Sequence, residues 1–249
     1  MRTVQTGPVI GLIGQVAVLA MLAGTVGLGV TGWLVGVACG LTTSATLSHG
    51  LARLGTAALG PADRVTLTRA TLVGGVAGLL ADAFVGPAAV ATVVGLAAVA
   101  LTLDAVDGWV ARRTGTASVL GARFDMEVDA FLVLVLSVYV ARSVGPWVLA
   151  IGMARYVFVA AGWLLPWMRA TLPPRYWRKP VAAIQGIVLT MAVADVLPML
   201  AIVIAITAAL GLLAESFGRD VCWLWRHGRV QTRQDVERPG VSTAASVSR

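Results

Sequence analysis

Acidic residues are concentrated in one short stretch of a chain that otherwise carries few charges. Five of the 12 acidic residues lie within residues 104–129. Asp104 and Asp107 are three residues apart, and Asp125 and Asp129 are four residues apart. In an α-helix both spacings place the two members of a pair on the same face. The pattern therefore predicts two consecutive helices, each presenting one pair of carboxylates.

Four carboxylates brought together would form a site for divalent metal ions. A carboxylate near the centre of a bilayer costs about 2.5–3.5 kcal/mol on insertion scales, and bound cations offset that cost. Mg²⁺ and Mn²⁺ prefer such oxygen ligands, whereas zinc sites usually contain histidine or cysteine. The histidines of the chain are His49 and His227, and neither lies near the acidic stretch in the sequence. We therefore predict two divalent cations, Mg²⁺ or Mn²⁺, as cofactors.

The acidic residues belong to a longer pattern with fixed spacing. It reads Asp104-x2-Asp107-Gly108-x2-Ala111-Arg112-x8-Gly121-x3-Asp125-x3-Asp129. This segment resembles the signature of the CDP-alcohol phosphotransferase (CDP-alcohol phosphatidyltransferase) family, because all eight signature positions match at allowed spacing. The resemblance implies a six-helix catalytic core, with the signature at the end of its second helix and the start of its third.

The resemblance also implies a role for each signature aspartate. Asp104, Asp107 and Asp125 would ligate metal. Asp129 would contact metal as well, and as the catalytic base it would accept the proton of the acceptor hydroxyl.

The remaining signature residues would bind the nucleotide. Gly108, Ala111 and Gly121 would leave room for the cytidine, because small residues on a helix face let a flat base approach the backbone. Arg112 would contact the diphosphate, whose charge a guanidinium matches.

Three basic residues outside the signature are candidates for the acceptor or phosphate site. Arg155 lies inside an apolar helix, where an arginine is costly. It would either face the central cavity and bind an anionic group, or pair with a signature acid. Arg178 and Lys179 precede a core helix, where they would bind anionic lipid or a phosphorylated acceptor, or act only as a topology signal.

Several polar residues near the signature receive no catalytic assignment. Glu127 is expected to form a salt bridge with Arg123, four residues earlier in the same helix. Three residues resemble the polar start of the family's first helix, which lines the nucleotide site, and they are Thr66, Thr68 and Arg69.

The helices that carry these residues must lie in a membrane. The chain is 58% hydrophobic and only 12% charged, about half the charged fraction of an ordinary soluble domain. A spanning helix needs about 20 mostly apolar residues. We predict eight such stretches, at residues 9–28, 30–47, 67–85, 87–106, 119–141, 146–165, 181–196 and 198–215. The expected fold is an all-α polytopic membrane helix bundle, with a six-helix family core plus two extra N-terminal transmembrane helices.

The composition changes along the chain and predicts four parts. Residues 1–48 form a glycine-rich N-terminal transmembrane helix pair, and the more polar residues 49–66 form an interfacial connector. Residues 67–217 form the six-helix catalytic membrane core, and residues 218–249 form a cytoplasmic polar tail.

The net charge of +7 does not indicate nucleic-acid binding. Its basic residues are spread over short loops and the C-terminal tail and do not form one face. With a cytoplasmic N-terminus, Arg142 would be the only basic residue clearly in an outside loop. We therefore predict an integral protein of the cell membrane with its active site facing the cytoplasm.

The predicted function is the transfer of a phosphatidyl, or other phospho-alcohol, group from a CDP-linked donor to an alcohol acceptor, with release of CMP, in phospholipid biosynthesis. The donor is expected to be CDP-diacylglycerol or another CDP-alcohol. Membrane lipids are expected partners, and the resemblance implies a homodimer. The acceptor stays open among glycerol 3-phosphate, inositol phosphate, serine, and a lipid alcohol paired with a soluble CDP-alcohol.

Two other functions are compatible with acidic residues in a membrane. An intramembrane prenyltransferase also holds an Mg-bound diphosphate on two aspartate-rich motifs, but these usually lie far apart in sequence. Here 17 residues separate Asp107 from Asp125. A non-enzymatic cation transporter or scaffold is the second alternative, since intramembrane acids often mark ion paths.

Overall fold

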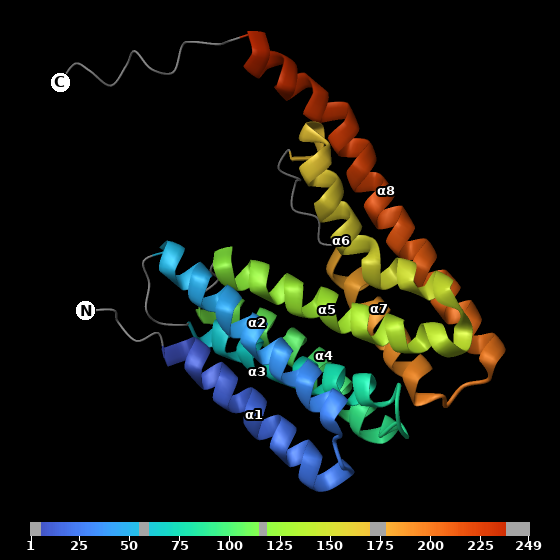
Figure 1. Ribbon diagram of the computed structural model, residues 1–249. Coiled ribbons are helices and arrows are strands. Elements are labelled where there is room, and N and C mark those ends of the chain that lie inside the picture. The colour runs from blue at the N-terminus through green and yellow to red at the C-terminus, as the bar shows by residue number, and fades with distance from the viewer. Residues whose placement is uncertain (1–5, 55–59, 115–118, 170–177, 238–249) are drawn as a thin grey trace.

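The computed structural model describes residues 6–54, 60–114, 119–169 and 178–237, and this part of the chain is helical without strands (Figure 1). This finding confirms the all-α prediction. The helices are α1 Thr6–Val26, α2 Val30–Leu54, α3 Pro61–Asp82, α4 Val90–Thr114, α5 Val119–Val144, α6 Leu149–Leu164, α7 Arg178–Ala194 and α8 Met199–Glu237, with short 3-10 helices at Pro146–Val148 and Pro166–Arg169.

Many of these helices have the length and composition of membrane spans. Among the described residues, five helical segments are long and apolar enough to cross a membrane, and they belong to α1, α2, α3, α6 and α8. The apolar parts of α4 and α7 are shorter, at Val90–Val106 and Pro180–Ala194. The polytopic membrane bundle predicted from the sequence is thereby confirmed.

Helix α3 is the central element of the bundle. In its most apolar window 72% of the residues are buried, compared with 22% in the windows of α1 and α2. It packs against α1, α2, α4 and α5. Val73, Val76 and Leu80 of α3 are almost completely buried in the main core cluster. A side chain on α3 can therefore reach several neighbouring helices.

The first turn of α3 has a well-defined helix start. Pro61 lies at the first helical position, where its missing N–H costs no hydrogen bond. The Asp63 carboxylate accepts a hydrogen bond from the backbone N–H of Gly60 at 3.1 Å. Its negative charge also lies at the positive end of the helix dipole. These features fix where α3 begins, and Arg69 follows about two turns later.

The N-terminal helix pair docks closely on α3. At the crossing of α2 and α3, a Cβ on Gly32 would lie 2.9 Å from the carbonyl oxygen of Gly78, so the two backbones approach too closely for larger residues. Gly27 has a φ of +76° in the turn between α1 and α2, a conformation that favours glycine. The Asp82 carboxylate at the end of α3 accepts hydrogen bonds from the backbone N–H of Gly29 at 2.7 Å and of Gly32 at 3.4 Å. Asp82 therefore caps the start of α2.

The opposite end of α2 contacts helices of the core. Leu47 and Leu51 are buried against Leu67 of α3, and Leu120 and Phe124 of α5 pack on the same cluster. Leu67 lies two residues before Arg69, and Phe124 directly precedes Asp125. The N-terminal pair thus supports the parts of α3 and α5 that carry charged residues.

The last helix is longer than its apolar part. Helix α8 contains 39 residues and continues to Glu237, which corresponds to a length of about 58 Å. The sequence predicted a polar tail from residue 218, and the structure continues the helix through the first part of that tail. Figure 1 shows the C-terminal end of α8 projecting beyond the other helices.

Helices α7 and α8 are joined by a polar contact and a tight turn. The Gln185 side-chain amide donates a hydrogen bond to the Ala209 carbonyl at 2.8 Å. Asp195 has a φ of +51° in the turn between the two helices.

Candidate active site

Three signature aspartates converge between α4 and α5. One carboxylate oxygen from each of Asp104, Asp125 and Asp129 lies within 4.8 Å of the other two. Asp125 and Asp129 therefore share one face of α5, as their spacing predicted. We call these three residues the aspartate cluster.

The aspartate cluster surrounds an arginine from the central helix. Helix α3 packs against both α4 and α5, and the guanidinium of Arg69 forms ion pairs with all three carboxylates. Arg69 Nη1 lies 3.0 Å from Asp104 Oδ1 and also contacts Asp125 Oδ1, while Nη2 contacts Asp129 Oδ1. The Nε–H donates a hydrogen bond to the Ala100 carbonyl of α4 at 3.2 Å.

Burial differs between the arginine and its partners. The Arg69 side chain is 1% exposed, whereas those of Asp104, Asp125 and Asp129 are 29–37% exposed. A buried guanidinium requires such partners, because an unpaired charge in a low-dielectric interior costs several kcal/mol. Arg69 therefore closes the buried side of the aspartate cluster, and the carboxylates remain partly accessible from the other side.

The charges and atom types of the aspartate cluster fit a divalent cation. Three carboxylates paired with one guanidinium leave a surplus of two negative charges. One Mg²⁺ or Mn²⁺ ion would neutralise this surplus. Carboxylate oxygens are the ligands that these hard cations prefer. Asp104, Asp125 and Asp129 are thus suited to hold metal.

The other signature residues lie on the same two helices. Asp107, Gly108, Ala111 and Arg112 belong to α4, but their side chains lie outside the described residues. Gly121 is described, and it precedes Asp125 on α5 by about one helical turn. Its position is compatible with a ligand approaching the helix next to the aspartate cluster.

The candidate acceptor residues are distributed differently. Arg178 and Lys179 belong to the first turn of α7, and their side chains lie outside the described residues. Arg155 of α6 forms an ion pair with Glu127 of α5, in which Nη2 contacts Oε1 and Nε lies 3.4 Å from Oε2. Helical spacing predicted that Glu127 pairs with Arg123 of the same helix, whereas the structure pairs it with an arginine of a neighbouring helix. The partner of Arg155 is therefore an acid outside the signature.

Arg69 was expected only to belong to the polar start of the family's first helix, without a catalytic assignment. The signal was present, because Arg69 lies within the apolar span Asp63–Asp82, and ionisable residues in membrane spans usually serve a function. The sequence did not show that its partners lie 31 or more positions away on two other helices.

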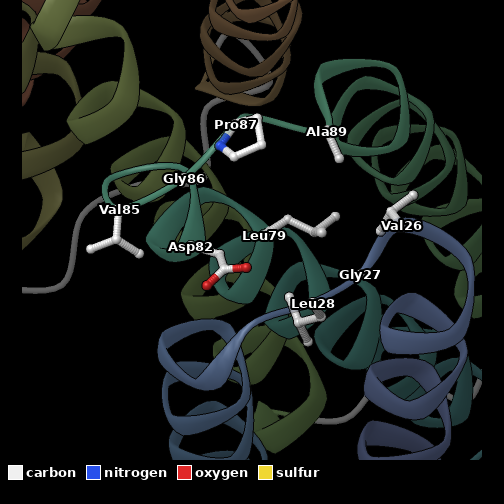
Figure 2. Close-up of a pocket in the computed structure, with 9 residues that line it drawn as sticks. All are labelled: Val26, Gly27, Leu28, Leu79, Asp82, Val85, Gly86, Pro87 and Ala89. Carbon is white, nitrogen blue, oxygen red and sulfur yellow. The ribbon is translucent and has the colours of Figure 1, made fainter.

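A pocket at the other end of α3 is separate from this site. It is lined mainly by apolar residues and by Asp82 (Figure 2). Asp82 lies 13 residues beyond Arg69, which corresponds to about 20 Å along the helix. Because its carboxylate already accepts hydrogen bonds from the start of α2, we regard Asp82 as a structural residue.

Comparison with known proteins identifies one family. A family model described as CDP-alcohol phosphatidyltransferase matches residues 59–213, which is more than half of the chain. The matched region includes the complete signature and Arg69, and it excludes α1 and α2. No curated protein and no solved structure matches the chain.

Proposed function

The chain belongs to the CDP-alcohol phosphatidyltransferase family, and on this basis we propose that it transfers a phosphatidyl group from CDP-diacylglycerol to an alcohol acceptor and releases CMP. Family membership indicates a transferase of phosphate-linked groups that uses CDP-alcohol substrates. The observation that carries the proposal is the convergence of Asp104, Asp125 and Asp129 from two helices within 4.8 Å of one another.

The proposed metal ligands are the four signature aspartates. Asp104, Asp125 and Asp129 form the aspartate cluster, and Asp107 lies about one turn after Asp104 on α4. Two Mg²⁺ or Mn²⁺ ions bound there would neutralise the diphosphate of the donor and the charge that develops on the leaving group.

Asp129 is the proposed general base. Its carboxylate is 30% exposed, so a hydroxyl approaching the open side of the aspartate cluster can reach it. The acceptor oxygen forms a new bond to the β-phosphorus of CDP-diacylglycerol, and the bond from that phosphorus to the oxygen of CMP breaks. The hydroxyl proton passes to Asp129, and CMP leaves with the bonding electrons. Positioning of Asp129 against the acceptor hydroxyl would contribute to the activation.

The nucleotide and the acceptor are proposed to occupy neighbouring regions. Gly108, Ala111 and Gly121 would accommodate cytidine, and Arg112 would contact its diphosphate. Basic residues at Arg155, Arg178 and Lys179 would attract an anionic acceptor or lipid headgroup.

The proposed setting is the cell membrane, with the active site facing the cytoplasm and with a role in phospholipid biosynthesis. The distribution of basic residues supports this orientation. We propose a homodimer from family membership.

A direct assay tests the proposal. Purified protein in detergent is incubated with Mg²⁺ or Mn²⁺, CDP-diacylglycerol and a panel of alcohols, and CMP is measured by chromatography. We expect CMP and a new phosphodiester lipid with at least one acceptor. An absence of CMP with every acceptor, under conditions in which another member of the family is active, would instead favour a prenyltransferase or a cation transporter.

A further inference from the structure

Arg69 and the proposed metal ions would share the same carboxylates. Its guanidinium contacts an oxygen of each member of the aspartate cluster, and the proposed metal ions would bind these same carboxylates. Its side chain is also held by the Ala100 carbonyl, so it is fixed on the buried side. A cation that enters from the exposed side would lie within a few ångströms of a positive charge, which repels it.

The charges indicate when this repulsion is relieved. Two divalent cations would neutralise all four signature carboxylates, and the positive charge of Arg69 would then be surplus. A diphosphate brings negative charge to the same place and removes the surplus. Metal binding is therefore weaker alone than together with the anionic donor, and this difference is a coupling free energy between the two ligands.

We infer that Arg69 is a built-in counter-charge that holds the aspartate cluster together without metal and makes tight binding of divalent cations dependent on the CDP-linked donor. This inference rests on the proposed function, because it assumes that the aspartate cluster binds metal. It assigns Arg69 as a positioning residue that controls the order in which metal and donor bind.

Mn²⁺ binding tests this role without measuring catalysis. Free Mn²⁺ is titrated against the purified protein by electron paramagnetic resonance, with and without cytidine 5′-diphosphate as a soluble probe. In the wild-type protein we expect the nucleotide to lower the Kd for Mn²⁺. Arg69→Gln should lower the Kd by about tenfold or more in the absence of nucleotide, and the additional effect of the nucleotide should shrink correspondingly.

Two control variants separate charge from general disturbance. Arg69→Lys keeps a positive charge on α3, so its Kd for Mn²⁺ should stay closer to the wild-type value than that of Arg69→Gln. Arg219→Gln removes an exposed arginine that pairs with Glu215 on α8, outside the aspartate cluster, and it should also leave the Kd unchanged. A Kd in folded Arg69→Gln that is equal to or higher than the wild-type value would overturn the inference, as would equal tightening in Arg69→Lys.

A variant that loses stability still gives a decisive result. If Arg69→Gln unfolds without metal, it is purified with Mn²⁺, and thermal midpoints are compared across Mn²⁺ concentrations. We expect Mn²⁺ to raise the midpoint of Arg69→Gln more than that of the wild type, because metal replaces the missing counter-charge. An equal or smaller rise would overturn the inference. Active wild-type enzyme with no tightening in Arg69→Gln refutes this inference alone, whereas failure of the wild type to bind Mn²⁺ even with the nucleotide present refutes the metal-dependent function as well.

Discussion

Replacement of Asp129 by asparagine separates catalysis from assembly of the site. The substitution keeps the shape of the side chain and removes its charge and its ability to accept a proton. Arg69 retains ion pairs with Asp104 and Asp125, and the new amide oxygen can still accept a hydrogen bond from Nη2. We therefore expect the folded structure and most of the donor site to persist.

The expected loss of kcat in Asp129→Asn follows from the role of a general base. Such a group contributes about 10²–10⁴-fold to the rate, so kcat for CMP release should fall by about that factor in Asp129→Asn. The KM for CDP-diacylglycerol should change by less than about tenfold, because the other signature carboxylates remain.

The assay is steady-state CMP release in mixed micelles, with thermal unfolding as a check of folding. Glu215→Gln is a suitable control, since Glu215 forms an exposed pair with Arg219 on α8, outside the aspartate cluster. The control should retain the wild-type kcat. A folded Asp129→Asn enzyme with a wild-type-like kcat would refute the assignment of Asp129 as the base.

Three further perturbations test other parts of the structure. Excess EDTA should abolish CMP release, and Mg²⁺ or Mn²⁺ should restore it. The thermal midpoint should fall only slightly, because Arg69 still neutralises part of the aspartate cluster. Activity that persists in EDTA would contradict the metal requirement. Leu51→Ala should destabilise the protein by about 2 kcal/mol and lower kcat, because Leu51 is 3% exposed and supports the start of α5. The control is Leu34→Ala, at an exposed position of the same helix. Equal effects of both variants would argue against this support. Asp82→Ala should lower the free energy of unfolding by about 1.5 kcal/mol, measured by thermal unfolding, and should retain CMP release in the same assay. A large loss of kcat in the folded variant would show that the far end of α3 influences the site.

Features that depend on local sequence were predictable. Long apolar runs predicted the helices, because a backbone inside a bilayer must satisfy its hydrogen bonds internally. The spacing of Asp125 and Asp129 predicted a shared helix face, and both residues lie in the aspartate cluster. The side chains of Asp107 and Arg112 lie outside the described residues, so their roles stay predictions.

Contacts between distant helices were not predictable in the same way. The pairing of Glu127 with Arg123 was inferred from helical spacing, but Arg155 of α6 is the partner in the structure. An exposed pair within one helix contributes only about 0.3–0.5 kcal/mol, so the packing of neighbouring helices easily decides between partners. Arg69 is a similar case, because its partners depend on α3 lying against both α4 and α5.

The length of α8 shows why helix ends are difficult to predict. The apolar run ends near Phe217, which suggested the end of the helix. The chain contains no proline from Met199 to Glu237, the range over which α8 is described. Loss of hydrophobicity marks where a helix leaves the membrane, and a helix without proline can continue beyond that point.

The most direct test of the proposed metal centre is the location of its ions. Crystals grown with Mn²⁺ and a CDP-alcohol would give an anomalous difference map that identifies manganese by its scattering. We predict two peaks within coordination distance of Asp104, Asp107, Asp125 and Asp129, next to the nucleotide diphosphate. A map with bound nucleotide and no manganese peak at these carboxylates would contradict the proposal.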